Sequence, residues 1–213
     1  MTRRRFPVGK TLLYVFMSLW ALTTIYPFIW VILNSFKPRG LIRSDTFSLP
    51  IGDKFTLENY VTAFKRVDIG TAYVNSIVIS GAVTVVVMVL AGLAAYAMVR
   101  YSFRLRGFLH SMIIASMMFP VFSTIIPVFR MESSWGIVNT GSIWLTRLSV
   151  VLPQIAGNLS FAIIVLMGFI RSLPVDLEEA AYLEGYNVYQ IFFRIIMPLA
   201  KPSFATVGIF TFL

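Results

Sequence analysis

The chain has 213 residues, of which 58% are hydrophobic and only 13% are charged. This composition excludes an ordinary water-soluble domain, in which about a quarter of the residues carry charge. The net charge of +9 does not indicate a nucleic-acid partner, because the basic residues flank long apolar runs, where they meet anionic membrane lipid. The absence of cysteine excludes disulfides, thiol nucleophiles and thiolate metal sites.

The first apolar run covers residues 11–36 and follows a basic N-terminus that contains Arg3, Arg4, Arg5 and Lys10. The run is longer than the roughly 7–15 residues of a signal-peptide core, and no small-residue cleavage site follows it. It therefore predicts a membrane span that is retained. The basic cluster predicts that the N-terminus lies in the cytoplasm, according to the positive-inside rule.

The segment after this run carries turn and helix-capping signals. Thr56 is a residue type that caps helices, and it precedes a short helical pattern through Tyr60 and Phe64. The alternative, a simple solvated hairpin between two spans, is equally compatible with the sequence.

Three further uncharged runs predict spans at residues 69–99, 107–129 and 148–170. Each has at least 23 residues, against the roughly 20 that cross a hydrocarbon core of about 30 Å. A fifth run, 202–213, has 12 residues, which as a helix reach only about 18 Å. We therefore expect an all-α polytopic transmembrane helix bundle with four full spans and a truncated fifth.

Three prolines interrupt the later spans. Pro120 and Pro127 lie in the third predicted span and Pro153 in the fourth. They predict kinks or broken turns, which membranes tolerate where the freed carbonyl groups face protein or a cavity.

The four predicted full spans contain no Asp, Glu, Lys or Arg, and His110 is the only histidine. Ion-coupled carriers and intramembrane proteases need such groups, so we expect no catalytic residue, no metal site and no enzyme. No G-x-x-x-x-G-K-[ST] loop is present, so we expect no cofactor on this chain.

A polar path across the membrane would then be lined by hydroxyl and amide groups, which exchange hydrogen bonds with a neutral, hydroxyl-rich solute. The candidate path residues are Asn75, Ser116, Gln154 and Asn158. The alternative for each is that it holds neighbouring helices together.

Residues 174–198 form an amphipathic, acidic segment between two apolar runs. A first helix is predicted at 177–184, with Asp176 as its N-cap and Glu179 completing a capping box. Gly185 follows the last turn, at a position where only glycine adopts a left-handed conformation without strain.

A second helix is predicted after Asn187, ending at Pro198. Its apolar residues recur at i, i+3, i+4, i+7 and i+8, which predicts one face packed on the ends of the spans. These residues are Val188, Ile191, Phe192, Ile195 and Ile196. The first helix carries only acids, which anionic lipid would repel, so it favours docking to a protein over resting on the membrane.

The segment also resembles a known motif. The order Glu179-Ala180-Ala181, three residues, Gly185, nine residues, Ile195, one residue and Met197-Pro198 resembles the EAA loop of bacterial binding-protein-dependent ABC importer permeases. Two further stretches, 34–37 and 56–60, resemble the carbohydrate, maltose-type class of these permeases. The resemblance implies an importer transmembrane domain over residues 1–213, incomplete at the C-terminus relative to the six spans of the family.

By this resemblance, the segment 172–201 is a cytoplasmic coupling loop that receives a separate ATPase subunit. The implied coupling residues are Glu178, Glu179, Ala180, Ala181, Leu183, Gly185, Ile195 and Pro198. The implied complex lies in the bacterial cytoplasmic membrane. It joins this multi-pass chain to a second permease, two ATP-binding subunits that use the ATP, and an external solute-binding protein.

The function that we expect is import of a sugar or similar neutral polyhydroxylated solute. The alternative is a stand-alone channel or facilitator, which would need no ATPase.

Overall fold

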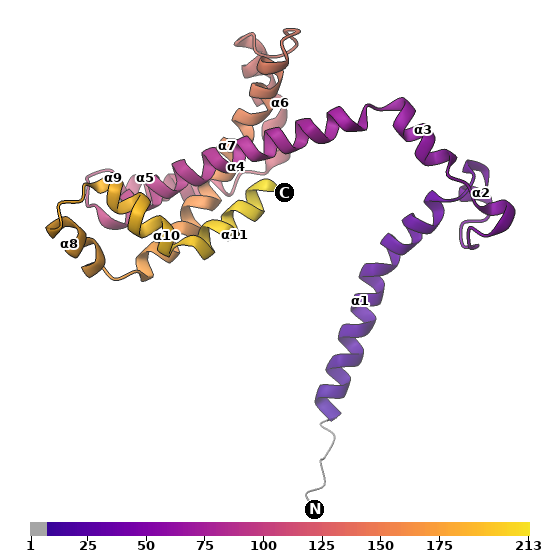
Figure 1. The fold of residues 1–213 in the computed structure, drawn as a ribbon, viewed down its shortest axis with the longest axis horizontal. Helices are drawn as coiled ribbons and strands as arrows, with labels where there is room; N and C mark the ends of the chain where they lie inside the picture. The colour runs from indigo at the N-terminus through magenta and orange to yellow at the C-terminus, as the bar shows by residue number, and fades with distance from the viewer. Residues whose placement is uncertain (1–7) are drawn as a thin grey trace, which may run out of the picture. The chain divides into compact units, whose positions relative to one another are not determined.

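The computed structural model describes residues 8–213, so the basic cluster Arg3, Arg4 and Arg5 lies outside the described residues. The chain divides into two compact units, residues 1–71 and 72–213. Every regular element in the described part is helical, which confirms the predicted all-α class (Figure 1).

The first unit has one long helix and three short elements: α1 (Val8–Ser35), α2 (Arg39–Ser44), the 3₁₀ turn η1 (Gly52–Lys54) and α3 (Glu58–Arg66). α1 is apolar around its circumference, and large side chains such as Trp20 and Phe28 are exposed. A helix of this kind is suited to lipid rather than water. The 27 residues of Gly9–Ser35 are long enough to cross a membrane, which confirms the first predicted span.

Asn59, at the start of α3, holds the chain that follows α1. Its side-chain amide donates to the carbonyl oxygens of Ser35 at 3.0 Å and Lys37 at 2.7 Å. The buried Lys37 ammonium donates to the carbonyl oxygens of Asp45 and Thr46. Paired in this way, the buried donors avoid the penalty of unsatisfied polar groups. These contacts join the two stretches that carry the carbohydrate-class resemblance, a role that sequence reasoning missed.

Thr56 does not cap α3 as predicted. Leu57 occupies the N-cap position, and no side chain caps the helix. Instead, the Thr56 hydroxyl accepts a hydrogen bond from the Glu58 amide, and the Thr56 amide donates to the Phe36 carbonyl oxygen at 2.7 Å. The short helix itself is present, so the alternative of a helix-free hairpin does not hold.

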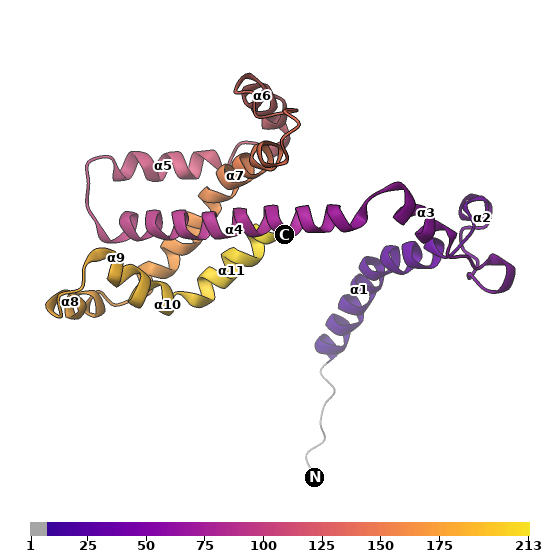
Figure 2. The same cartoon turned by 45° about the horizontal axis from the view of Figure 1, so that its top comes forward.

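The second unit contains two long helices, three of intermediate length and a series of short ones. They are α4 (Ile69–Arg100), α5 (Arg106–Ser116), α6 (Val121–Ser134), α7 (Ile143–Ser172), α8 (Asp176–Leu183), α9 (Val188–Ile191), the π-helix η2 (Phe192–Ile196), α10 (Met197–Leu199) and α11 (Lys201–Phe212). α4 and α7 are long and apolar enough to cross a membrane, which confirms the predicted spans at 69–99 and 148–170. In both views α11 lies beside α4 (Figures 1 and 2).

The core of the second unit forms where α7, η2 and α11 pack against α4. Fully buried residues recur at every fourth position of α4: Val83, Val87, Ala91 and Ala95. Gly92 lies on the same helix, and a Cβ atom there would come within 2.9 Å of the rings of Phe192 and Phe204. The missing side chain of Gly92 therefore allows η2 and α11 to approach α4.

The third predicted span, 107–129, is not a continuous helix. α5 and α6 are separate helices of 11 and 14 residues, each too short to cross the membrane alone. The break falls at Pro120, which has no N–H to donate and whose ring clashes with the carbonyl group four residues earlier. The break predicted at Pro120 is therefore confirmed, whereas the helices continue through Pro127 and Pro153.

The fifth predicted run also differs from expectation. The segments Val188–Leu199 and Lys201–Phe212 meet at a bend of 82°, and together they qualify as one broken or re-entrant span. By length and composition, the described residues hold three single-helix spans and a bent fourth candidate, and the predicted third span is divided between α5 and α6. These long apolar helices confirm the predicted class, an all-α polytopic membrane bundle.

We expect Gly92→Ala to lower the free energy of unfolding by about 1–3 kcal/mol, because the added methyl group meets the rings of Phe192 and Phe204. Gly81→Ala is the matched control on the same helix. Nothing lies within 4 Å of its Cβ position, and alanine favours helix over glycine. Thermal unfolding of the two purified variants measures the difference. Equal stability of the two would contradict the close packing at Gly92.

Candidate functional site

Helix α8, the first helix of the acidic segment, begins one residue before the predicted start. Val175 occupies its N-cap position in a helical conformation, and no side chain makes a capping hydrogen bond. The predicted capping box between Asp176 and Glu179 is therefore wrong. The acids Asp176, Glu178 and Glu179 still lie in the first turn, where they complement the positive end of the helix dipole.

Gly185 ends α8 as predicted. Its φ angle of +84° is in the left-handed region, which glycine adopts without strain. The Gly185 amide donates to the Tyr182 carbonyl oxygen and the Tyr186 amide to that of Ala181, both at 3.0 Å. This pair of bonds is a Schellman motif, and it satisfies carbonyl groups that the helix end would otherwise leave free.

The capping box of this segment stands one helix later than predicted. The Asn187 side chain accepts a hydrogen bond from the Gln190 amide, and the Gln190 side chain accepts one from the Asn187 amide, both at 2.9 Å. α9 accordingly begins at Val188, as expected of a helix that follows Asn187. The sequence signal for this capping box is the N-x-x-Q pattern of residues 187–190, which the prediction missed because it considered only an acidic residue at the third helical position.

Pro198 does not end the second helix. The five residues of η2 form a π-turn, in which the Met197 amide donates to the Phe192 carbonyl oxygen. A π-turn before a proline relieves the contact between the ring and the preceding carbonyl groups, so the helix continues to Leu199. The 82° bend follows at Ala200.

The apolar face predicted for the second helix packs into the core of the second unit. Ile191, Phe192 and Ile196 are buried there, and Ile195 is half-buried. Val188, at the first turn, remains 37% exposed. The second helix is thus fixed against α4 and α11 through this face.

Glu178 and Glu179 point to different environments. Glu178 is buried, and its carboxylate accepts hydrogen bonds from Tyr96 Oη at 2.8 Å and Arg100 Nε at 2.5 Å. Arg100 Nη2 also donates to the Leu173 carbonyl oxygen at 2.9 Å. Glu179 is exposed. The carboxylate of Glu178 therefore holds α8 to the end of α4, whereas we had expected it to offer its charge to a partner.

A second contact ties α8 to the residue that follows α4. The hydroxyl groups of Tyr101 and Tyr182 lie 3.0 Å apart. Partial burial and this hydrogen bond raise the pKa of the Tyr101 phenol, so it stays protonated near neutral pH. Ala181, beside Tyr182, is buried.

The opposite side of α8 is free. Asp176, Ala180 and Leu183 recur at i, i+4 and i+7, so they share the face that points away from buried Glu178 and Ala181. Leu183 is 90% exposed. This outer face, three residues on one short helix, is a narrow ridge with an apolar tip.

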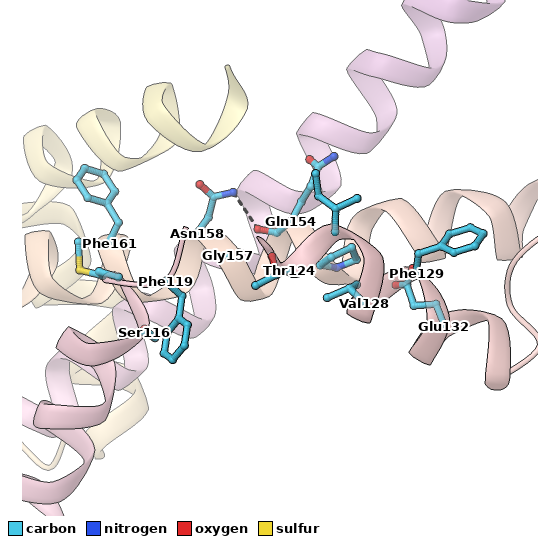
Figure 3. Close-up of a pocket in the computed structure, with 13 residues that line it drawn as sticks. Ser116, Phe119, Thr124, Val128, Phe129, Glu132, Gln154, Gly157, Asn158 and Phe161 are labelled. Carbon is cyan, nitrogen blue, oxygen red and sulfur yellow. Dashed lines mark hydrogen bonds between the residues drawn. The ribbon is translucent and has the colours of Figure 1, made fainter. Parts of the chain in front are cut away.

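A cavity of about 660 Å³ lies between the end of α5, α6 and α7 (Figure 3). Three of the four predicted path residues line it, namely Ser116, Gln154 and Asn158. Asn75 is not among its lining residues. The side-chain oxygen Oδ1 of Asn75 accepts two hydrogen bonds from Arg147, at 2.7 Å from Nη2 and 3.2 Å from Nε, so the alternative role of holding α4 to α7 fits Asn75 better.

Glu132 also lines the cavity, and sequence reasoning missed it. It lies beyond residue 129, where the third predicted span ends, but α6 extends to Ser134. The signal was present as a helical pattern, because Ile125, Val128, Phe129 and Glu132 recur at i, i+3, i+4 and i+7 and all line the cavity.

Comparison with known proteins gives concordant results. Residues 88–213 match the family described as "Binding-protein-dependent transport system inner membrane component". The diacetylchitobiose uptake system permease protein of Streptomyces coelicolor is 36% identical over 200 residues, 94% of this chain and 64% of that protein. The trehalose transport system permease protein of Mycobacterium tuberculosis is 33% identical over 189 residues, 89% of this chain and 66% of that protein. The chain thus spans just under two thirds of the length of these relatives.

A solved structure has the same fold. A bacterial ABC transporter involved in the import of the acidic polysaccharide alginate superposes with a TM-score of 0.78. The match covers 99% of this chain and 71% of that one, at 23% sequence identity.

We expect Glu178→Ala to destabilise the protein by about 3–5 kcal/mol, because it leaves the buried Arg100 guanidinium without its carboxylate. Glu179→Ala is the control, because Glu179 is adjacent and exposed. Thermal unfolding of the purified variants gives the comparison. The double variant Glu178→Leu with Arg100→Met should lose less stability than the sum of its single changes. Additive losses would show that the two residues are not paired.

Proposed function

The chain belongs to the family of binding-protein-dependent transport system inner membrane components, and on this premise we propose that it is a permease subunit of an ATP-driven importer. It forms half of a translocation path for a sugar or similar neutral polyhydroxylated solute. Two relatives named for the uptake of sugars, diacetylchitobiose and trehalose, support this solute class.

The observation that carries the proposal is helix α8. It presents exposed Leu183 on its outer face while its inner face is held to α4 by buried Glu178. A surface helix of this kind has one face that can bind a partner and an opposite face that packs on the rest of the chain. We propose that the outer face docks into a groove of an ATPase subunit, with exposed Glu179 contributing charge complementarity.

The other predicted coupling residues divide between the two sides. Exposed Ala180 allows close approach of the partner, and Gly185 sets the turn. Buried Ala181 and half-buried Ile195 pack inward. Pro198 sits beside the π-turn, where it helps to direct the chain toward α11.

The complete importer, in this proposal, contains a second permease, two ATP-binding subunits that hydrolyse the ATP, and an external solute-binding protein. It lies in the bacterial cytoplasmic membrane with the N-terminus of this chain in the cytoplasm. α1 then crosses outward and α4 crosses back, so the Arg100 end of α4 is cytoplasmic. The contact of Glu178 with Arg100 supports the same side for α8.

The mechanism that we propose is transmission of rigid-body motion. ATP binding closes the ATPase dimer and moves α8. The ion pair of Glu178 with Arg100 carries this motion to α4, and the buried face of the second helix carries it to the core shared with α7 and α11. Packed elements of this kind switch between discrete arrangements rather than deforming continuously. The cavity beside α7, with Ser116, Gln154 and Asn158, would change its access as α7 moves.

We expect Leu183→Asp to reduce recovery of the ATPase subunit with the permease more than tenfold, because it places a charge where an apolar tip must be buried. Stability should be unchanged, because Leu183 is already 90% exposed. Leu49→Asp is the matched control, because it is the same substitution at an exposed leucine outside the helices of the first unit. Affinity purification of the tagged permease measures recovery of the ATPase subunit. Solute uptake into membrane vesicles measures the transport that depends on that subunit.

Normal ATPase recovery and normal uptake by the Leu183→Asp variant would contradict the docking role of α8. Solute flux through the reconstituted permease without any ATPase would instead support a stand-alone channel or facilitator.

A further inference from the structure

Glu132 is a buried carboxylate that the described part of the chain leaves without a partner. Only 5% of the residue is exposed, and it lines the cavity between α6 and α7. No described residue forms a hydrogen bond or ion pair with its side-chain oxygens. Figure 3 shows Glu132 at the opposite end of the cavity from Phe161. The residue as a whole is buried, but its carboxylate oxygens are accessible from the cavity, so they can accept hydrogen bonds from a group that enters from outside the chain.

The rest of the cavity wall offers no compensating positive charge. Among the described residues that line it, Glu132 alone is ionisable. The amide nitrogen of Asn158 is already used, because it donates to the Gln154 carbonyl oxygen at 2.8 Å. The Ser116 hydroxyl is also engaged, by Ser160 at 2.5 Å and by the Ile113 carbonyl oxygen. The Gln154 side-chain amide offers both donors and an acceptor, and Asn158 keeps its oxygen, so the excess of hydrogen-bond acceptors on this wall comes from the Glu132 carboxylate.

We infer that Glu132 sets the charge preference of this cavity, so that it accepts solutes rich in hydrogen-bond donors, neutral polyols and amino sugars, and disfavours anionic ones. This inference rests on the proposal that the cavity belongs to the translocation path. Carboxylate and amide oxygens accept hydrogen bonds from hydroxyl or ammonium groups, and the aromatic walls at Phe119 and Phe161 pack against the apolar faces of a ring-shaped solute. An anionic group would instead meet a like charge that is weakly screened in a buried site.

The absence of cysteine from the chain provides a direct test. Gly157→Cys introduces one thiol in the cavity wall, where nothing lies within 4 Å of the new Cβ atom. In the full-length, assembled importer in membrane vesicles, the labelling rates of two methanethiosulfonate reagents are compared. One is the cationic trimethylammonium-ethyl reagent and the other is the anionic sulfonato-ethyl reagent. Ile125→Cys provides a second reporter, on α6, should the first variant fail to assemble.

We expect Glu132→Gln to lower the ratio of cationic to anionic labelling by roughly tenfold, because one charge acts with opposite sign on the two reagents. Glu58→Gln, which removes an exposed carboxylate from the first unit, should leave the ratio unchanged. An unchanged ratio in Glu132→Gln, with both reagents reacting, would overturn the inference and leave the aqueous path intact. Failure of both reagents to label either reporter would overturn the proposed path itself, and this inference with it.

Discussion

The buried ion pair between Glu178 and Arg100 is the constraint on which the position of α8 depends. Its two side chains are 5% and 10% exposed, and Tyr96 adds a hydrogen bond to the same carboxylate. A buried ion pair contributes little net stability compared with apolar residues of the same volume. Removing one partner, however, leaves the other charge buried and unpaired. The pair therefore acts chiefly to fix where α8 lies. It leaves the other face of α8, with Leu183 at its tip, free for a partner.

The same helices connect α8 to the cavity. α4 carries Arg100 at one end and Asn75 near the other, where Arg147 of α7 binds it. α7 lines the cavity through its middle and leads directly into α8. Gly92 allows η2 and α11 to pack closely on α4 between these two points. In the mechanism that we propose, motion applied at α8 reaches the cavity through these packed helices.

Two local backbone requirements were predictable from the sequence, although the caps predicted at Thr56 and Asp176 were not found. Gly185 adopts the positive φ angle that its position required, and Asn187 starts the next helix. The helical class and the spans at α1, α4 and α7 followed from the length of their apolar runs. These features depend on neighbouring residues and on the length and polarity of each run, and both can be read directly from the sequence.

Features that depend on distant contacts were not predictable. Glu178 and Glu179 are adjacent residues of the same type. Glu178 is buried only because Arg100, from a helix far earlier in the chain, pairs with its carboxylate. Glu132 fell outside the predicted span 107–129 because that span was defined as an uncharged run, although a cavity accommodates this carboxylate. The same limitation explains the prolines, since a sequence cannot say that Pro120 breaks a helix while Pro127 and Pro153 do not.

The central claim is that Glu178 transmits the motion of the ATPase to α4. The most direct measurement is the number of solute molecules transported per ATP hydrolysed by the reconstituted importer that carries Glu178→Gln. This change removes the charge but keeps the shape of the side chain and the outer face of α8. We expect the ATPase to remain bound and active while the transport ratio falls about tenfold, since each lost 1.4 kcal/mol of coupling changes an equilibrium by that factor. A ratio equal to that of the unmodified importer would contradict the account.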